Sequence, residues 1–199
     1  MSEQTIVIIG SGIAGLSAAE AARKQDPDAR IILLSEDANL PYHRPRLPGV
    51  VMVPDTIDRV FLHDQAWYDD RQFDLRLGTK VERVDVDNQR IVLSDLSTID
   101  YDKLILATGS SSFMPPTPGN DLPGVFTLWT LDDAIAISDY IEDVQTAVVI
   151  GSGLLGLEIA YALKKRGLDT TILERGQALL KRQLDPRASA MFQEQVERL

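Results

Sequence analysis

The sequence predicts an α/β fold, because one strand–turn–helix–strand pattern occurs twice and a run of alternating residues separates the two copies. The first copy spans residues 5–36 and the second spans residues 146–174. Their strands read as continuous apolar runs, which are typical of a parallel sheet. Residues 75–101 alternate with a period of two instead, which predicts a small β-meander outside the parallel sheet.

The first copy carries a glycine turn, G-x-G-x-x-G, between its strand and its helix. The expected elements are a strand at 5–9, a helix at 16–25 and a strand at 30–35. Gly10 permits the turn, Gly12 lets backbone N–H groups approach a pyrophosphate, and Gly15 lets the helix lie close to the strand. Glu36 ends the second strand, where a carboxylate can accept hydrogen bonds from ribose hydroxyls. This context favours dinucleotide binding over a purely structural turn.

The second copy repeats every part of this pattern. The expected elements are a strand at 146–150, a turn at 151–156, a helix at 157–166 and a strand at 170–173 that ends at Glu174. The distance from first glycine to terminal acid is 26 residues (10 to 36) in one copy and 23 (151 to 174) in the other. Both values are close to the spacing of about 20 in dinucleotide folds. Two sites are therefore favoured over a duplicated structural unit without a ligand.

The rest of the chain supports two Rossmann-like domains. We expect a loop or broken helix at 37–53, a short helix at 61–71, a parallel strand at 103–107, a helix from Thr130 to about Glu142 and a helix from Asp185. Trp67, Tyr68 and Phe73 are expected to be core or interface aromatics and not to stack on a cofactor. The expected domains are residues 1–110, with the meander at 75–101, a Pro- and Gly-rich linker at 111–124, and residues 125–199. The second domain has two strands where such a half normally has three. We therefore expect it to be truncated, as the N-terminal part of a longer protein or a shortened chain.

Composition excludes several classes of function. A net charge of −10 argues against general affinity for nucleic acid or an anionic membrane. No run approaches the roughly 18 apolar residues of a membrane helix, and no signal peptide precedes the first strand, so we expect a cytoplasmic protein. The 199 residues contain no cysteine and two histidines, which argues against disulfides, a redox dithiol or a histidine metal cluster. The oligomeric state stays open.

With both turns placed, the chain resembles the pyridine-nucleotide-dependent flavoprotein oxidoreductases of the glutathione-reductase-like fold. The motifs that carry the resemblance are the two glycine turns, Leu104-Ile-Leu-Ala-Thr-Gly-Ser110, the linker Asp121-Leu-Pro-Gly-Val-Phe-Thr127 and Glu158 after the second turn. Leu40-Pro-Tyr-His-Arg-Pro-Arg-Leu47 is similar to a segment of the branch without active-site cysteines. That branch includes rubredoxin reductases, ferredoxin reductases and the flavin-binding part of nitrite reductases.

The resemblance implies FAD in the first site, NADH in the second, and a redox protein as the electron acceptor. Residues implied at the FAD site are Gly10, Gly12, Ile13, Ala14, Gly15, Glu36, Arg44, Val81, Ala107, Thr108 and Gly109. Those implied at the nicotinamide site are Gly151, Gly153, Leu154, Leu155, Gly156, Glu158 and Glu174. The cofactors carry the chemistry, so no catalytic side chain is expected.

Two departures from the branch affect these expectations. Pro48-Gly49 replaces a common Ser-Lys, so the usual lysine partner of Glu158 is missing. The family's last FAD-binding segment, a Gly-Asp motif, is absent from these residues. We therefore expect little or no turnover from the 199 residues alone.

Glu174 predicts a preference for NADH over NADPH, because a 2′-phosphate would meet a like charge; neighbouring Arg175 could soften this effect. Three functions stay open at this point: an NADH-dependent FAD oxidoreductase with a rubredoxin-, ferredoxin- or nitrite-reductase-like acceptor, a flavin-binding module of a larger complex, and an ordinary NAD dehydrogenase without flavin.

Overall fold

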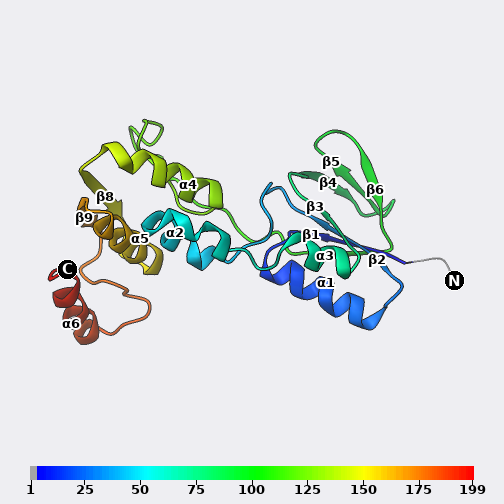
Figure 1. The fold of residues 1–199 in the computed structure, drawn as a ribbon, viewed down its shortest axis with the longest axis horizontal. Helices are drawn as coiled ribbons and strands as arrows, with labels where there is room; N and C mark the ends of the chain where they lie inside the picture. Colours follow the sequence, from blue (N-terminus) through cyan, green and yellow to red (C-terminus); the bar gives the residue numbers. More distant parts are fainter. Residues whose placement is uncertain (1–3) are drawn as a thin grey trace. The chain divides into compact units, whose positions relative to one another are not determined.

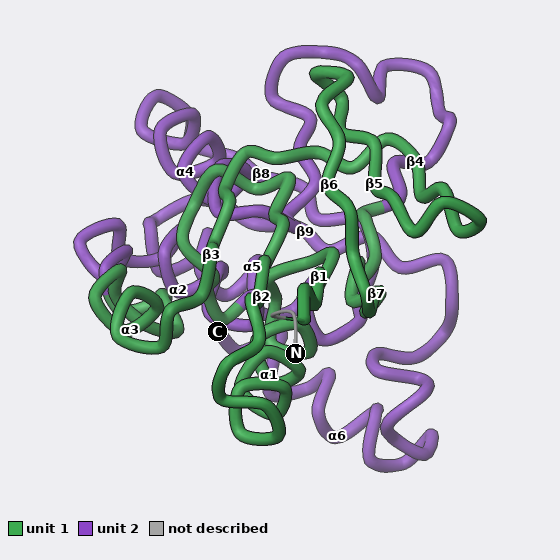
Figure 2. Tube along the Cα trace, turned by 90° about the vertical axis from the view of Figure 1, so that its right-hand side faces the viewer, with its two compact units in different colours: residues 1–43, 59–112 green, residues 44–58, 113–199 purple. Residues whose placement is uncertain are grey.

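A computed structural model describes residues 4–199 and divides the chain into two compact units. The first unit combines the described part of residues 1–43 with residues 59–112, and the second combines residues 44–58 with residues 113–199. Figure 2 colours the two units separately. Each unit contains one of the two glycine turns, so each is described by itself.

The first unit is built on a four-stranded parallel sheet with the order β3-β2-β1-β7. Its strands are β1 (Thr5–Ile9), β2 (Arg30–Leu34), β3 (Phe73–Arg76) and β7 (Lys103–Leu106), and helix α1 (Ile13–Gln25) connects β1 to β2 (Figure 1). The short helix α3 (Gln65–Asp70) begins at Asp64, whose side chain accepts a hydrogen bond from the Trp67 amide. The predicted parallel α/β arrangement is confirmed.

Both faces of this sheet are covered by apolar side chains. On one face, Ile8 and Leu33 pack with Leu16 of α1 and with the buried ring of Tyr68 from α3. On the other face the antiparallel meander of β4 (Val81–Asp85), β5 (Arg90–Leu93) and β6 (Thr98–Asp100) supplies Ile91 and Leu93. The continuous apolar pattern of β1 and β2 follows from this burial on two sides.

The meander begins later than predicted. The meander was expected to begin at Leu75, but residues 73–76 form β3, which pairs in parallel with β2 at the edge of the main sheet. An edge strand is partly exposed, so Asp74 and Arg76 alternate with the apolar Phe73 and Leu75 and imitate an antiparallel pattern. The period-of-two signal was correct for the strand and wrong for its sheet.

The second unit contains a two-stranded parallel sheet and four α-helices in the described residues. Its elements are α2 (Leu47–Met52), α4 (Leu131–Tyr140), β8 (Thr146–Ile150), α5 (Leu154–Lys165), β9 (Asp169–Leu173) and α6 (Pro186–Val196), with short 3₁₀ turns at Arg44–Arg46, Pro54–Arg59 and Ile141–Asp143. The predicted helix starts are confirmed: Thr130 and Asp133 form a capping box, and Asp185 caps α6 ahead of Pro186.

The sheet of the second unit is covered on one face only. Alternate residues of β8 and β9 pack toward α5, while Val148, Ile150 and Leu173 of the opposite face are between 53% and 80% exposed. In the first unit, the equivalent face lies beneath the meander. The two copies of the sequence pattern therefore share a backbone arrangement and differ in what surrounds it.

Residues 44–58 lie in the second unit, although the sequence placed them in a domain that ends at residue 110. Helix α2 packs against α4 and α5, and Leu47, Val50 and Val51 are almost fully buried. Arg166, just after α5, donates to the Val51 carbonyl (2.8 Å) and to the Ser138 hydroxyl (3.1 Å), and it pairs with Glu142. The assignment of one cofactor to each predicted domain stays a prediction.

Within residues 4–199, the structure has no helix that combines the length and apolar character needed to cross a bilayer.

Replacing Arg166 with alanine should destabilise the second unit by about 1–3 kcal/mol, because the Val51 carbonyl loses its charged donor. Urea unfolding of the variant measures this change. The control is Arg187→Ala, which removes an exposed cation from α6 and should change the free energy of unfolding by less than about 0.5 kcal/mol. Equal effects of the two substitutions would show that Arg166 does not tie α2 in place.

Candidate dinucleotide sites

The first glycine turn is shaped by close backbone contacts. Gly10 has a φ of +105°, and its amide donates to the Leu34 carbonyl at 2.8 Å. A Cβ on Gly10 would lie 2.1 Å from the carbonyl oxygen of Ala107, and a Cβ on Gly15 would lie 1.8 Å from the carbonyl oxygen of Gly10. Neither position has room for a side chain. The structural roles predicted for Gly10 and Gly15 are therefore confirmed.

Gly12 stands in a different environment from the other two glycines. It is the N-cap of α1, and no described atom lies within 4 Å of where its Cβ would be. No side chain of the described residues caps this helix end, and its first turn has no acidic residue. The N–H groups of Ile13 and Ala14 thus begin a helix whose positive end is open to an anion. The predicted binding of a pyrophosphate at this open helix end stays a prediction.

The strand β7 ends beside the first turn. Ala107 still donates to the Ile9 carbonyl (2.8 Å), after which Thr108 and Gly109 leave the sheet, with a φ of +68° at Gly109. Thr108 and Gly109 are exposed, and Leu106 and Ile13 are 66% and 65% exposed. The structure therefore brings the predicted 107–109 segment and the glycine turn together at the carboxyl edge of the sheet, where α/β folds bind ligands.

Glu36 follows β2 at the same edge and is paired with a residue that the sequence interpretation missed. Lys80 lies 3.1 Å from the Glu36 carboxylate, whose side chain is 71% exposed. Lys80 immediately precedes Val81, the predicted adenine contact at the start of β4. The hydrogen bond that Lys80 donates to the Glu36 carboxylate raises the pKa of Lys80. No sequence signal relates residues 36 and 80, which meet through the fold.

Arg44 was also predicted at the FAD site, and the structure places it in the second unit. Its guanidinium donates to the Trp129 carbonyl and lies 5.2 Å from the centre of the Trp129 ring. Its predicted place beside the FAD phosphates or ring stays a prediction.

The second glycine turn has the same backbone geometry as the first. Gly151 has a φ of +107°, and its amide donates to the Leu173 carbonyl at 2.8 Å. A Cβ on Gly156 would lie 2.1 Å from the Gly151 carbonyl oxygen, whereas no described atom lies within 4 Å of a Cβ on Gly153. Helix α5 begins at Leu154 without a side-chain cap or an acidic first turn in the described residues. A second open anion cradle is the result.

Glu174, at the end of β9, is held by the turn itself. Its Oε2 accepts hydrogen bonds from the Ser152 amide (3.0 Å) and hydroxyl (2.7 Å), and its Oε1 accepts one from the Gly176 amide (2.6 Å). These bonds from Gly176 and Ser152, with a smaller contribution from nearby Lys181, lower the pKa of Glu174 from 4.5 to about 2. The sequence interpretation missed Ser152. A serine occupies the same position in both turns, so the motif does not indicate that only one of them holds the acid at the end of the strand.

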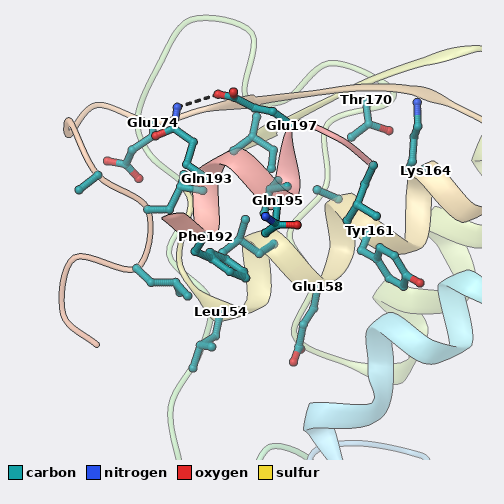
Figure 3. A pocket seen from close by; sticks show the side chains of 18 of the residues that line it. Leu154, Glu158, Tyr161, Lys164, Thr170, Glu174, Phe192, Gln193, Gln195 and Glu197 are labelled. Carbon is teal, nitrogen blue, oxygen red and sulfur yellow. Dashed lines mark hydrogen bonds between the residues drawn. The ribbon is translucent and has the colours of Figure 1, made fainter. Parts of the chain in front are cut away.

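A pocket of about 760 Å³ lies between α5, the 176–180 loop and α6 (Figure 3). Leu154, Glu158 and Glu174 are the predicted nucleotide-site residues that line it, together with apolar side chains such as Tyr161 and Phe192. Leu155 does not line this pocket and is 38% exposed. Three of the seven residues predicted for the second site thus line this pocket.

Gly49, where the resemblance implies a lysine, has room for a side chain. No described atom lies within 4 Å of a Cβ on Gly49, which is in α2. The absence of a side chain at this position is therefore not required by close packing.

Comparison with protein families decides the classification. The model of the pyridine nucleotide-disulphide oxidoreductases matches residues 4–199. The chain belongs to this family. Among family relatives, rhodocoxin reductase of Rhodococcus erythropolis is 39% identical over 190 residues, which are 94% of this chain and 44% of the relative. The electron transfer subunit of the Bacillus subtilis assimilatory nitrate reductase is 33% identical over 198 residues, 99% of this chain and 26% of the relative.

Solved structures of family relatives share the fold. The ferredoxin reductase of the CYP199A2 system from Rhodopseudomonas palustris matches with a TM-score of 0.92 and 28% identity, covering 98% of this chain and 48% of that one. NADH:rubredoxin oxidoreductase from Clostridium acetobutylicum matches with a TM-score of 0.89 and 31% identity, covering 99% and 51%. The chain spans about half the length of these relatives, or less.

Two substitutions in the first turn should have opposite consequences. Gly15→Ala should cost about 3 kcal/mol of stability or more, because its methyl group meets the Gly10 carbonyl oxygen. Gly12→Ala should change stability by no more than about 1 kcal/mol but weaken FAD binding at least about tenfold, because its methyl group enters the open cradle. Urea unfolding and titration with FAD measure the two effects. A Gly12→Ala protein that binds FAD normally would contradict the predicted role of this turn.

The depressed pKa of Glu174 should make part of the stability depend on pH. A carboxyl group whose pKa is lower in the folded state stabilises the fold above its unfolded pKa, near 4.5, and loses this effect as the pH falls to about 2. The difference in unfolding free energy between the native protein and Glu174→Gln should therefore be largest near neutral pH and shrink below pH 4.5. Urea unfolding from pH 7 to pH 3 provides the measurement. A difference that does not vary with pH would contradict the assignment.

Proposed function

We propose that this chain is the FAD-binding and NADH-binding part of an oxidoreductase that passes electrons from NADH through FAD to a redox partner protein. The observation that carries the proposal is the pair of glycine turns. Each turn has an open cradle at an uncapped helix end, at Gly12 and Gly153, and a carboxylate at the end of the following strand. A turn with a purely structural role would require neither the open helix end nor the carboxylate, and both features occur in both copies.

The residues of the first turn fit the pyrophosphate of FAD. The amides of Ile13 and Ala14 at the start of α1 supply donors and partial positive charge, and Glu36 supplies an acceptor for ribose hydroxyls. Lys80 holds Glu36 at the edge of the sheet. Ala107, Thr108 and Gly109 would lie on the flavin side of the cofactor. When bound, FAD supplies the redox chemistry by accepting hydride from NADH and releasing electrons to an acceptor.

The residues of the second turn fit the nicotinamide cofactor. The amides of Leu154 and Leu155 begin α5 beside the open position of Gly153, and the Glu174 carboxylate would accept a hydrogen bond from the adenosine ribose. The roles of Glu158 and Gly156 are to line the site and to bring α5 close to the turn. The chain's own side chains therefore bind and orient, which is consistent with the lack of a catalytic set in the sequence.

The names of the relatives support a protein acceptor. They include a rhodocoxin reductase, a ferredoxin–NAD(+) reductase component of a biphenyl dioxygenase system and an NADH:rubredoxin oxidoreductase. One related structure is a complex of putidaredoxin reductase with putidaredoxin. We propose an acceptor of this class, a small iron–sulfur or rubredoxin-type protein, and a cytoplasmic location in which NADH is available.

The experiment that tests the function is reconstitution with FAD followed by addition of NADH without oxygen. A bound flavin gives a visible absorption spectrum, and in the full-length chain NADH should bleach it. The absence of flavin binding would overturn the proposal. Flavin binding without bleaching would favour the second candidate, a flavin-binding module of a larger complex.

The protein should bind NADH at least about tenfold more tightly than NADPH, or NADH should reduce the flavin at least about tenfold faster. A 2′-phosphate about 4 Å from the Glu174 carboxylate would be repelled by on the order of 4 kcal/mol at an effective dielectric constant of 20, before screening. Rates of bleaching with both cofactors measure the preference. Glu174→Gln should reduce the difference between the two cofactors, since the glutamine side chain carries no charge. Faster reduction by NADPH in the native protein would reject the assignment.

A further inference from the structure

Ser152 connects three parts of the second site. It lies inside the glycine turn with 2% of its surface exposed. Its amide and its hydroxyl both donate to Oε2 of Glu174, and its carbonyl accepts a hydrogen bond from the Leu180 amide at 3.2 Å. One buried residue thus joins the turn, the acid at the end of β9 and the loop that follows it.

The loop is fixed from its other side as well. The Gly176 amide donates to Oε1 of Glu174 at 2.6 Å, and the Ser189 hydroxyl on α6 donates to the Leu179 carbonyl at 2.7 Å. Both oxygens of Glu174 therefore have partners, and the carboxylate cannot rotate without breaking hydrogen bonds to a charged group, which are the stronger kind.

The first turn shows that this arrangement is not a necessary result of the motif. Ser11 occupies the same position as Ser152 and is also buried, and Glu36 ends the strand as Glu174 does. In the described residues, however, the Glu36 carboxylate pairs with Lys80 and keeps 71% of its side chain exposed. The same residue types therefore give an exposed, ion-paired acid at one site and an acid held by three hydrogen bonds at the other.

Fixation limits what Glu174 can accept. A carboxylate offers about four lone-pair positions. Three are taken by Ser152 and Gly176, which leaves about one for a ligand. A ribose 2′-hydroxyl can donate one hydrogen bond to that position. A 2′-phosphate has no proton to donate near neutral pH, and a fixed carboxylate cannot turn away from it.

We propose that Ser152 is a positioning residue for cofactor selectivity, which holds the Glu174 carboxylate where it accepts a ribose hydroxyl and rejects a 2′-phosphate. The inference rests on the proposed function, because it assumes that the second turn binds a pyridine nucleotide. It adds that selectivity depends on the rigidity of the acid and not on its charge alone.

The test compares dissociation constants for NADH and NADPH in the FAD-loaded protein and in Ser152→Ala. Removal of the hydroxyl leaves the charge of Glu174 in place but takes away one of the three hydrogen bonds that orient its carboxylate, so the NADH preference should fall about tenfold. Ser152→Thr, which retains the hydroxyl, should keep most of the preference. Ser138→Ala removes another buried serine hydroxyl of the same unit, distant in sequence from the turn, and should leave the preference unchanged.

The possible outcomes distinguish failure of the positioning role of Ser152 from failure of the proposed function. A native protein that binds neither cofactor overturns the proposed function and the inference together. A native protein that prefers NADH, with the same ratio in Ser152→Ala, overturns the inference alone. A loss of affinity for both cofactors by the same factor also overturns it, since that result indicates a structural role. Thermal unfolding and the flavin spectrum of each variant establish that the fold is retained.

Discussion

The contact on which each site depends is the approach of a helix to the carbonyl oxygen of the turn that precedes it. At Gly15 and Gly156 even a methyl group would lie within 1.8–2.1 Å of that oxygen. The approach brings α1 and α5 against their sheets and directs their uncapped N-termini toward open space. The glycines that allow this packing and the glycines that leave room for a ligand are different residues. Within the six residues of each turn, close packing and open space for a ligand therefore depend on different glycines.

Much of the fold could be predicted from the sequence because its signals are local. Continuous apolar strands, glycine turns and helix caps at Thr130 and Asp185 depend on neighbouring residues. The errors arose where the deciding contact is distant. Residues 73–76 alternate like a meander but pair with β2 as an edge strand, and residues 44–58 pack with α4 and α5 across a long sequence separation.

The candidate sites show the same limit. The glycines and terminal acids follow from spacing, and the structure gives both turns the same backbone. The surroundings of the two acids could not be predicted, because Lys80 reaches Glu36 through the meander, and Gly176 reaches Glu174 through a loop without a regular pattern. Two copies of one motif therefore need separate functional interpretation, since Lys80 and Gly176 lie outside the motif.

The position of residues 44–58 has a consequence for how the units unfold. The chain passes between the units at residues 43/44, 58/59 and 112/113. Helix α2 therefore belongs to the second unit, although the segments before and after residues 44–58 belong to the first. Melting of the second unit releases α2, which then becomes a loose loop within the sequence of the first unit. The entropy of that loop couples the two transitions. A cut within residues 113–124 would likewise leave the two pieces associated, because the N-terminal piece retains the apolar helix on which α4 and α5 close.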